Sequence, residues 1–148
     1  MREFAWFFLL LVTASPLFAA GGVHAVYAGG SVASLNPGTS GALDFTSTIV
    51  LRFTAGGSTF DIPYRGIQSF EQSNEPAFHL GVAPAIAVGL VAPRRRSHFL
   101  RIDFNDSNGV AQVAVFRVSK SMHLYLIPLL EARAPHAQCV PFINCAPR

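Results

Sequence analysis

Residues 48–62 read TIVLRFTAGGSTFDI, and this stretch decides the fold class. Alternate residues from Thr48 to Thr54 are apolar, which is the period of a β-strand with one buried face. The side chains expected on that face are Ile49, Leu51 and Phe53. The two glycines of Ala55–Ser58 supply the positive φ angles that a tight turn requires. A second strand is expected over Thr59–Ile62, so the stretch predicts a β-hairpin.

The same alternation recurs on both sides of this hairpin. Upstream, we expect an irregular strand over Tyr27–Leu35, which includes a Gly-Gly pair, and a short strand at Leu43–Phe45. Downstream, the expected strands are Tyr64–Gln72 (after Pro63), Ser97–Asn105 and Val110–Val118. Asp106–Gly109 has the composition of a hairpin turn. Val110–Val118 is apolar on both faces, which predicts a central position in the sheet.

Beyond Val118 the period changes to that of a helix. The apolar residues fall at positions i, i+3, i+4 and i+7, namely Met122, Tyr125, Leu126 and Leu129. Ser119 or Ser121 is suited to cap the start of this helix. Pro128 predicts a kink or the start of a second segment. The fold class is therefore mainly β (α+β): an antiparallel, partly closed β-barrel or bent sheets of about seven strands, capped by one C-terminal amphipathic helix.

Composition limits the classes of protein that remain. The chain has 148 residues, of which 51% are hydrophobic and 13% charged, and its formal net charge is +3. A disordered polar chain needs less hydrophobicity and more net charge. A chain of this length is also too short for a multidomain enzyme.

The first 20 residues, MREFAWFFLLLVTASPLFAA, have the layout of a secretory signal peptide. A positive start precedes the apolar run Phe4–Val12, and small residues follow Pro16. The alternative, an uncleaved membrane anchor, needs about 20 apolar residues, and this run is shorter. We expect cleavage near Ala19 or Ala20 and export to the periplasm or the extracellular space. Residues 21–134 then form a single domain.

Both cysteines lie in the expected tail, residues 135–148, at Cys139 and Cys145. In an exported chain this spacing predicts one small disulfide loop. Two alternatives remain open: free thiols in an exposed tail, and a metal site that includes His136.

The order of elements resembles the pleckstrin-homology-like superfold, especially its GRAM-like and bacterial branches. The residues that carry the resemblance are Gly41–Phe45, Leu51-Arg52-Phe53, Ile62–Ile67 and Phe116-Arg117-Val118 running into the helix. The resemblance covers about Tyr27–Arg133 and implies binding of phosphoinositides, other lipids or peptides rather than catalysis. Lipid-binding members usually carry Lys and Arg in the loop that corresponds to Asn36–Gly41. That loop has no charge here, so no phosphoinositide pocket is transferred. Lipocalin-like barrels and an unrelated β-sandwich are the alternative folds.

One basic cluster follows an apolar stretch. Ala77–Pro93 leads into three arginines, and a surface of this kind can meet an anionic membrane. The candidate surface residues are Leu90, Arg94, Arg95, Arg96 and His98. The alternatives are a connection packed on the domain, with the arginines as its solvated end, and a patch for a protein partner.

Other chemistry finds little support in the residues. From Asp103 a calcium loop would need Gly at the sixth position and Glu at the twelfth, so the hairpin interpretation is preferred. The histidines are scattered and lack metal-ligand spacing. They are His24, His79, His98, His123 and His136. No nucleophile elbow or phosphate-binding glycine motif occurs, and the basic residues are too few and too dispersed for nucleic acid.

The sequence therefore predicts an exported, non-catalytic binding domain, without a cofactor or metal, whose partner is another protein of the envelope or extracellular space. The alternative is a peripheral membrane module that binds anionic lipid through Ala77–Leu90 and Arg94–Arg96. The sequence does not fix the identity of the partner or the oligomeric state.

Overall fold

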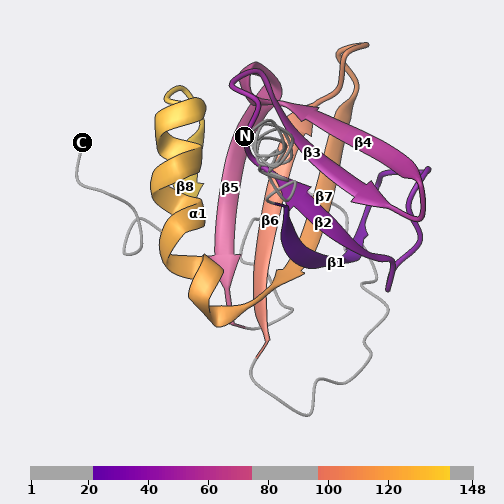
Figure 1. Ribbon diagram of the computed structural model, residues 1–148. Coiled ribbons are helices and arrows are strands. Elements are labelled where there is room, and N and C mark those ends of the chain that lie inside the picture. The colour runs from indigo at the N-terminus through magenta and orange to yellow at the C-terminus, as the bar shows by residue number, and fades with distance from the viewer. Residues whose placement is uncertain (1–21, 75–96, 141–148) are drawn as a thin grey trace, which may run out of the picture.

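The computed structural model describes residues 22–74 and 97–140. These residues form one mixed β-sheet of eight strands and a short C-terminal helix (Figure 1). In chain order the elements are β1 (Val23–Gly30), β2 (Ser40–Asp44), β3 (Val50–Ala55), β4 (Ser58–Pro63), the 3₁₀ turn η1 (Tyr64–Gly66), β5 (Ile67–Ser73), β6 (His98–Asn105), β7 (Ala111–Val118), α1 (Lys120–Arg133) and β8 (Gln138–Val140).

The strand order across the sheet is β4-β3-β2-β1-β7-β6-β5-β8. Two antiparallel meanders, β1–β4 and β5–β7, are joined where β1 pairs with β7. The expectation of a mainly β protein with a C-terminal helix is confirmed. The sheet is not fully antiparallel, because β8 pairs with β5 in parallel. It also does not close, since β4 and β8 are its two edges, so a partly closed barrel is unconfirmed.

The hairpin of β3 and β4 forms as its sequence predicts. Leu51 and Phe53 are buried, and Arg52 and Thr54 between and after them are exposed. The two turn glycines have φ angles of +56° and +82°, so this turn needs the conformational freedom of glycine. The prediction for Ile49 was wrong, since its side chain is 70% exposed. The Ser47 hydroxyl accepts the Ile49 N–H, and this local turn keeps Ile49 outside β3.

The first strand begins earlier and ends earlier than predicted, at Val23 and Gly30 rather than at Tyr27 and Leu35. The β1–β7 register shifts between Tyr27 and Gly29, so Ala28 forms a bulge directly before the glycine pair. Gly30 has φ +142°, and a Cβ there would lie 2.1 Å from the carbonyl oxygen of Val113. The close approach of β7 therefore requires glycine and ends the strand.

The β6–β7 hairpin is confirmed. The Asp106 carboxylate accepts the backbone N–H groups of Asn108 and Val110 at 2.8 and 2.9 Å. Gly109 has the positive φ, +78°, that closes the turn. The Asp106 carboxylate therefore stabilises the turn through backbone hydrogen bonds, in agreement with the hairpin interpretation. The central position predicted for β7 is also confirmed, because β7 lies between β1 and β6.

The helix α1 continues through Pro128 as one element of 14 residues, so the predicted second segment does not occur. Ser119 is the N-cap residue, but its side chain makes no capping hydrogen bond. The predicted apolar stripe was partly wrong, because Tyr125 is 68% exposed. The fully buried side chains of α1 are Leu126, Ile127 and Leu130. Packing on the sheet has rotated the buried face of α1 away from the face that spacing alone indicated.

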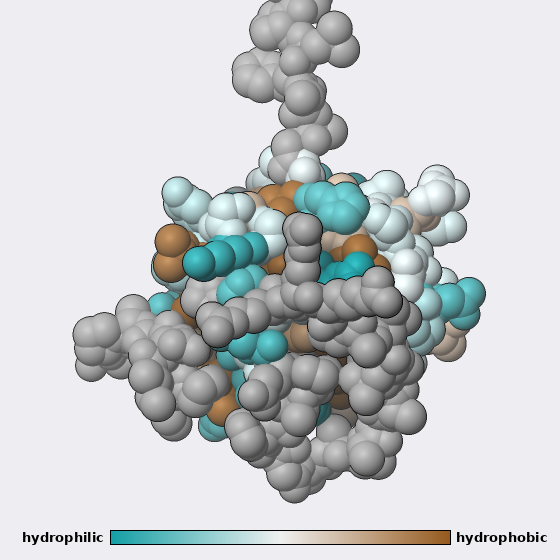
Figure 2. Space-filling model, turned by 90° about the horizontal axis from the view of Figure 1, so that it is seen from below, coloured by the Kyte–Doolittle hydropathy of each residue, from teal (hydrophilic) through white to brown (hydrophobic). Residues whose placement is uncertain are grey.

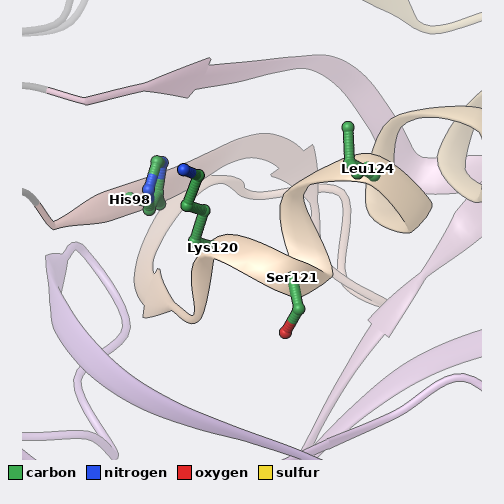
Figure 3. Close-up of a pocket in the computed structure, with 4 residues that line it drawn as sticks. All are labelled: His98, Lys120, Ser121 and Leu124. Carbon is green, nitrogen blue, oxygen red and sulfur yellow. The ribbon is translucent and has the colours of Figure 1, made fainter.

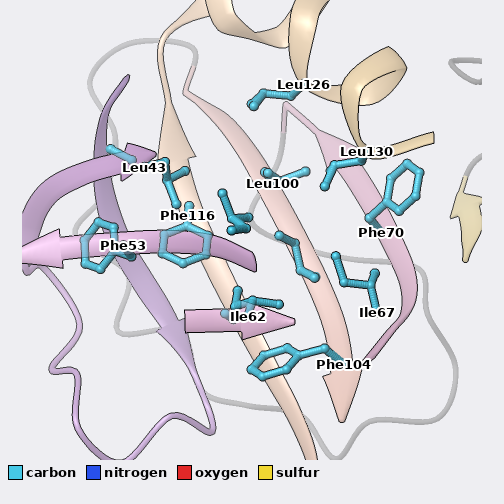
Figure 4. Close-up of a cluster of buried hydrophobic side chains, with 14 of the residues drawn as sticks. Leu43, Phe53, Ile62, Ile67, Phe70, Leu100, Phe104, Phe116, Leu126 and Leu130 are labelled. Atoms are coloured by element: carbon cyan, nitrogen blue, oxygen red, sulfur yellow. The ribbon is translucent and has the colours of Figure 1, made fainter. Parts of the chain in front are cut away.

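The core lies between α1 and the inner face of the sheet, where Leu126 and Leu130 point toward Leu100 and Phe70 (Figure 4). The ring centroids of Phe53 in β3 and Phe116 in β7 are 5.1 Å apart. In a flat sheet, strands three places apart would be separated by about 14 Å. Phe60 of β4 and Phe104 of β6 are likewise in ring contact at 5.9 Å. The sheet is therefore strongly bent around an aromatic core.

We predict that Phe116→Ala lowers the free energy of unfolding by about 3–5 kcal/mol, because it removes a fully buried ring that touches two other aromatic rings. The matched control is Leu124→Ala, at a side chain that is 73% exposed. The control should stay within about 0.5 kcal/mol of the parent. Urea denaturation followed by circular dichroism measures both. Equal losses in the two variants would contradict this account of the core.

The buried tyrosines predict a loss of stability in alkali. Burial raises the pKa of Tyr27 and of Tyr64 above the ordinary value of about 10. A raised pKa favours folding while the unfolded phenol stays neutral, and this contribution is lost as the pH rises beyond about 10. Urea midpoints between pH 8 and pH 11 should therefore fall, and the fall should be smaller in the Tyr27→Phe/Tyr64→Phe double variant. An unchanged fall in that variant would refute the assignment.

Candidate binding surface at the start of α1

Strand pairing brings the start of β6 beside the start of α1. His98, the first residue of β6, pairs with Val118, the last residue of β7. Ser119 follows Val118, and α1 begins at Lys120. A cavity of about 600 Å³ lies at this junction, with His98, Lys120, Ser121 and Leu124 among its lining residues (Figure 3). We call this cavity, with these four lining residues, the α1 pocket.

The polar part of the α1 pocket contains one lysine, one histidine and one serine. Figure 3 shows the Lys120 amine beside the imidazole ring of His98. The first turn of α1 contains no acidic residue. The Ser119 hydroxyl lies 3.0 Å from that of Ser121, and no side chain caps the helix. Because the first N–H groups of a helix carry partial positive charge, this end of α1 adds to the positive field.

The apolar part is an exposed pair on the helix. Leu124 and Tyr125 are 73% and 68% exposed. Ile49 and Val110 are also large, apolar and exposed, but they lie elsewhere in the chain. Figure 2 views the molecule from the end where α1 starts, and apolar and hydrophilic side chains lie beside each other on the coloured part of this surface. An exposed apolar pair next to Lys120 is a surface suited to binding rather than to packing.

The structure accounts for one predicted surface residue. His98 lines the α1 pocket. The others, Leu90 and Arg94–Arg96, lie outside the described residues, as does the whole of Ala77–Pro93. Sequence reasoning missed Lys120, Ser121 and Leu124. The position of Lys120 directly after a predicted cap was a usable signal. The exposure of Leu124 could not be predicted from the sequence, because it depends on how α1 packs on the sheet.

The structure corrects the prediction of an exposed tail at Cys139. Cys139 is only 4% exposed, because β8 pairs with β5 and Cys139 lies opposite Phe70. Cys145 lies outside the described residues, so the Cys139–Cys145 disulfide remains a prediction.

A second polar cluster lies on the opposite face of the sheet. The Arg101 guanidinium donates to Asp103 at 2.9 and 3.2 Å, and the Ser69 hydroxyl donates to the same carboxylate at 3.0 Å. Glu71 pairs across the strands with Arg101, and both side chains are buried. The contacts between Ser69, Arg101 and Asp103 have the character of a structural ion pair. They include no histidine that would activate the serine as a nucleophile.

Within residues 22–74 and 97–140, no group of three metal-ligating side chains comes together. In the same part of the chain, no helix has the length and apolar character needed to cross a membrane. Comparison of the chain with protein-family models, with curated proteins and with solved structures found no match.

Gln72 is a buried polar residue on the same face of the sheet as the α1 pocket. It pairs with Leu100, which follows His98 by two residues on that face. Its side chain is 3% exposed, and neither amide atom has a hydrogen-bond partner among the described residues. A buried amide without a partner costs folding free energy.

We predict that Gln72→Met raises the free energy of unfolding by about 1–3 kcal/mol, because it keeps the volume and removes the unsatisfied amide. The control is Gln112→Met, since the Gln112 amide oxygen accepts a hydrogen bond from Ser31 at 2.6 Å. The control should give no gain in a urea titration. A loss of stability in Gln72→Met would show that the amide has a partner in solution.

Proposed function

We propose that this protein is an exported, non-catalytic binding domain whose partner is another protein of the envelope or extracellular space. The layout of residues 1–20 supports export. Two meanders of four and three strands followed by one helix are consistent with the resemblance to pleckstrin-homology-like domains, which typically bind rather than catalyse. A disulfide between Cys139 and Cys145 belongs to the same proposal, since the compartment permits it.

The observation that carries this function is the exposed pair Leu124 and Tyr125 on α1. A helix of a single domain normally turns its large apolar side chains toward the core. Here two consecutive large side chains are exposed, and one of them, Leu124, lines a cavity. Exposed aromatic and aliphatic residues of this kind commonly anchor protein interfaces.

We predict that a photo-crosslinking residue, p-benzoylphenylalanine, at position 125 gives a discrete protein adduct in the exported fraction of the source cells. The matched control carries the same residue at Val110, which is apolar and 53% exposed and lies directly before β7, at the end of that strand away from α1. Adding Leu124→Asp to the position-125 variant should reduce the adduct at least tenfold. The comparison is made by denaturing gel and mass spectrometry.

The outcome that refutes the proposal is absence of an adduct at position 125, or an adduct of equal yield at position 110. Because both reporters lie on exposed positions, misfolding is not the expected cause of either result. The urea midpoint of each variant checks this directly.

The second candidate function is attachment to an anionic membrane surface through Ala77–Leu90 and Arg94–Arg96. One observation favours it. Lys120 lies beside His98 at the α1 pocket, and Arg96 precedes His98 by two residues in the sequence. This alternative predicts sedimentation with anionic vesicles that is lost in an Arg94/Arg95/Arg96→Ala variant. Binding to a protein partner makes no such prediction.

A further inference from the structure

Two buried apolar side chains lie outside the core described above. Phe99 and Val115 are only 6% and 4% exposed, yet neither belongs to the cluster between the sheet and α1. Each directly precedes a core residue on its strand, Leu100 in β6 and Phe116 in β7. Because successive side chains of a strand point to opposite faces, Phe99 and Val115 lie on the outer face of the sheet, away from α1.

The same outer face buries two charged side chains. Glu71, Arg101 and Val115 are cross-strand partners, so they form one row across β5, β6 and β7. Glu71 is 2% exposed and Arg101 is 8% exposed. Since the Arg101 side chain is itself buried, it is not the outermost layer over Val115. A further layer of atoms therefore lies over this row.

The outer face of the first meander is open by comparison. Its side chains on β3 and β4 are exposed, namely Arg52, Thr54, Thr59 and Asp61. An antiparallel sheet commonly buries one face and leaves the other in water, and the first meander follows this rule. The described elements do not explain why the second meander departs from it. All the described strands belong to the one sheet, and α1 packs on the inner face (Figure 4).

The connection between β5 and β6 has the length and the composition to supply the missing layer. β5 ends at Ser73 and β6 begins at His98, so 24 residues join two adjacent antiparallel strands. A hairpin loop needs only about 2–5 residues. Residues 77–93, AFHLGVAPAIAVGLVAP, include no charged residue, which suits an apolar surface. Glu71 lies two residues before the end of β5, about 7 Å along the strand, so the row is within reach of this connection.

We propose that the outer face of the second meander is the docking surface for residues 77–93 of the same chain, with their apolar side chains against Phe99 and Val115. This docking uses the face opposite α1 and does not depend on the binding function proposed above. A segment docked on the sheet does not present Ala77–Leu90 to a membrane, so the lipid-binding alternative would then rest on Arg94–Arg96 alone.

NMR spectroscopy tests the docking without any substitution. The sample is the purified protein from Gly21 onward, which contains every described element. We expect nuclear Overhauser effects between the Val115 methyl groups and side chains of residues 77–93. A soluble gadolinium chelate should broaden the Val115 methyl signals by less than twice as much as those of Val118. Val118 is the matched control, because it is a valine of β7 that is 6% exposed and lies in the core on the inner face.

A second sample replaces residues 77–93 with a Gly-Ser chain of the same length. We expect the chelate to broaden the Val115 methyl signals at least fivefold more than in the parent, because their cover has been removed. The broadening of Val118 should change less than twofold, which shows that the inner core persists. If this variant does not fold, the Overhauser effects in the parent still decide the question.

The proposal is overturned if Val115 shows Overhauser effects to residues 141–148 instead, since the tail would then be the occupant, or if it shows none to either segment. It is also overturned if the Gly-Ser variant folds and keeps Val115 as protected as in the parent. The crosslinking experiment at position 125 reports on α1, on the other face of the sheet. Failure of one proposal therefore leaves the other standing.

Discussion

The rest of the structure depends on the bend of the sheet around Phe116. This ring packs against Tyr27 of β1 and Phe53 of β3, at centroid distances of 5.9 and 5.1 Å. Tyr27 and Phe116 are cross-strand partners on neighbouring strands, whereas β3 lies two strands beyond β1, so the Phe53–Phe116 contact is the one that bends the first meander toward β7. The bend leaves the inner face of the second meander to α1, whose Leu130 completes the core. It thereby sets where α1 starts, and so where the pocket lies.

Features that depend on neighbouring residues could be predicted from the sequence. The turns at Gly56-Gly57 and at Asp106–Gly109 are determined by the residues within them, and both hairpins form as expected. Features that depend on distant contacts could not be predicted. The three residues of β8 are too few to show a period, and their partner is far away in the sequence. The exposure of Tyr125 and the pocket itself depend on how α1 rotates on the sheet, which spacing alone does not determine.

The two edges of the sheet are protected in different ways. At β4, the Tyr64 N–H donates to the Ile49 carbonyl, which fixes the alternation of inward and outward groups along the strand. The backbone groups of Thr59 and Asp61 then point away from β3, toward the open edge. The next residue in this position is Pro63, which has no N–H. Arg52 binds Asp61 at 2.7 Å and holds the pKa of that carboxyl below its usual range. A charged, proline-ended edge is a poor template for another strand.

On the other side of the sheet, the three-residue strand β8 pairs with β5 and satisfies part of the backbone edge of β5. This has a consequence for the order of assembly. The central pairing of β1 with β7 needs residues up to Val118, and the pairing of β5 with β8 needs residues up to Val140. Neither contact can form until most of the chain is available, and such non-local pairing is slow to form. For the exported protein proposed above, this arrangement means that the sheet becomes complete only after residues up to Val140 have crossed the membrane.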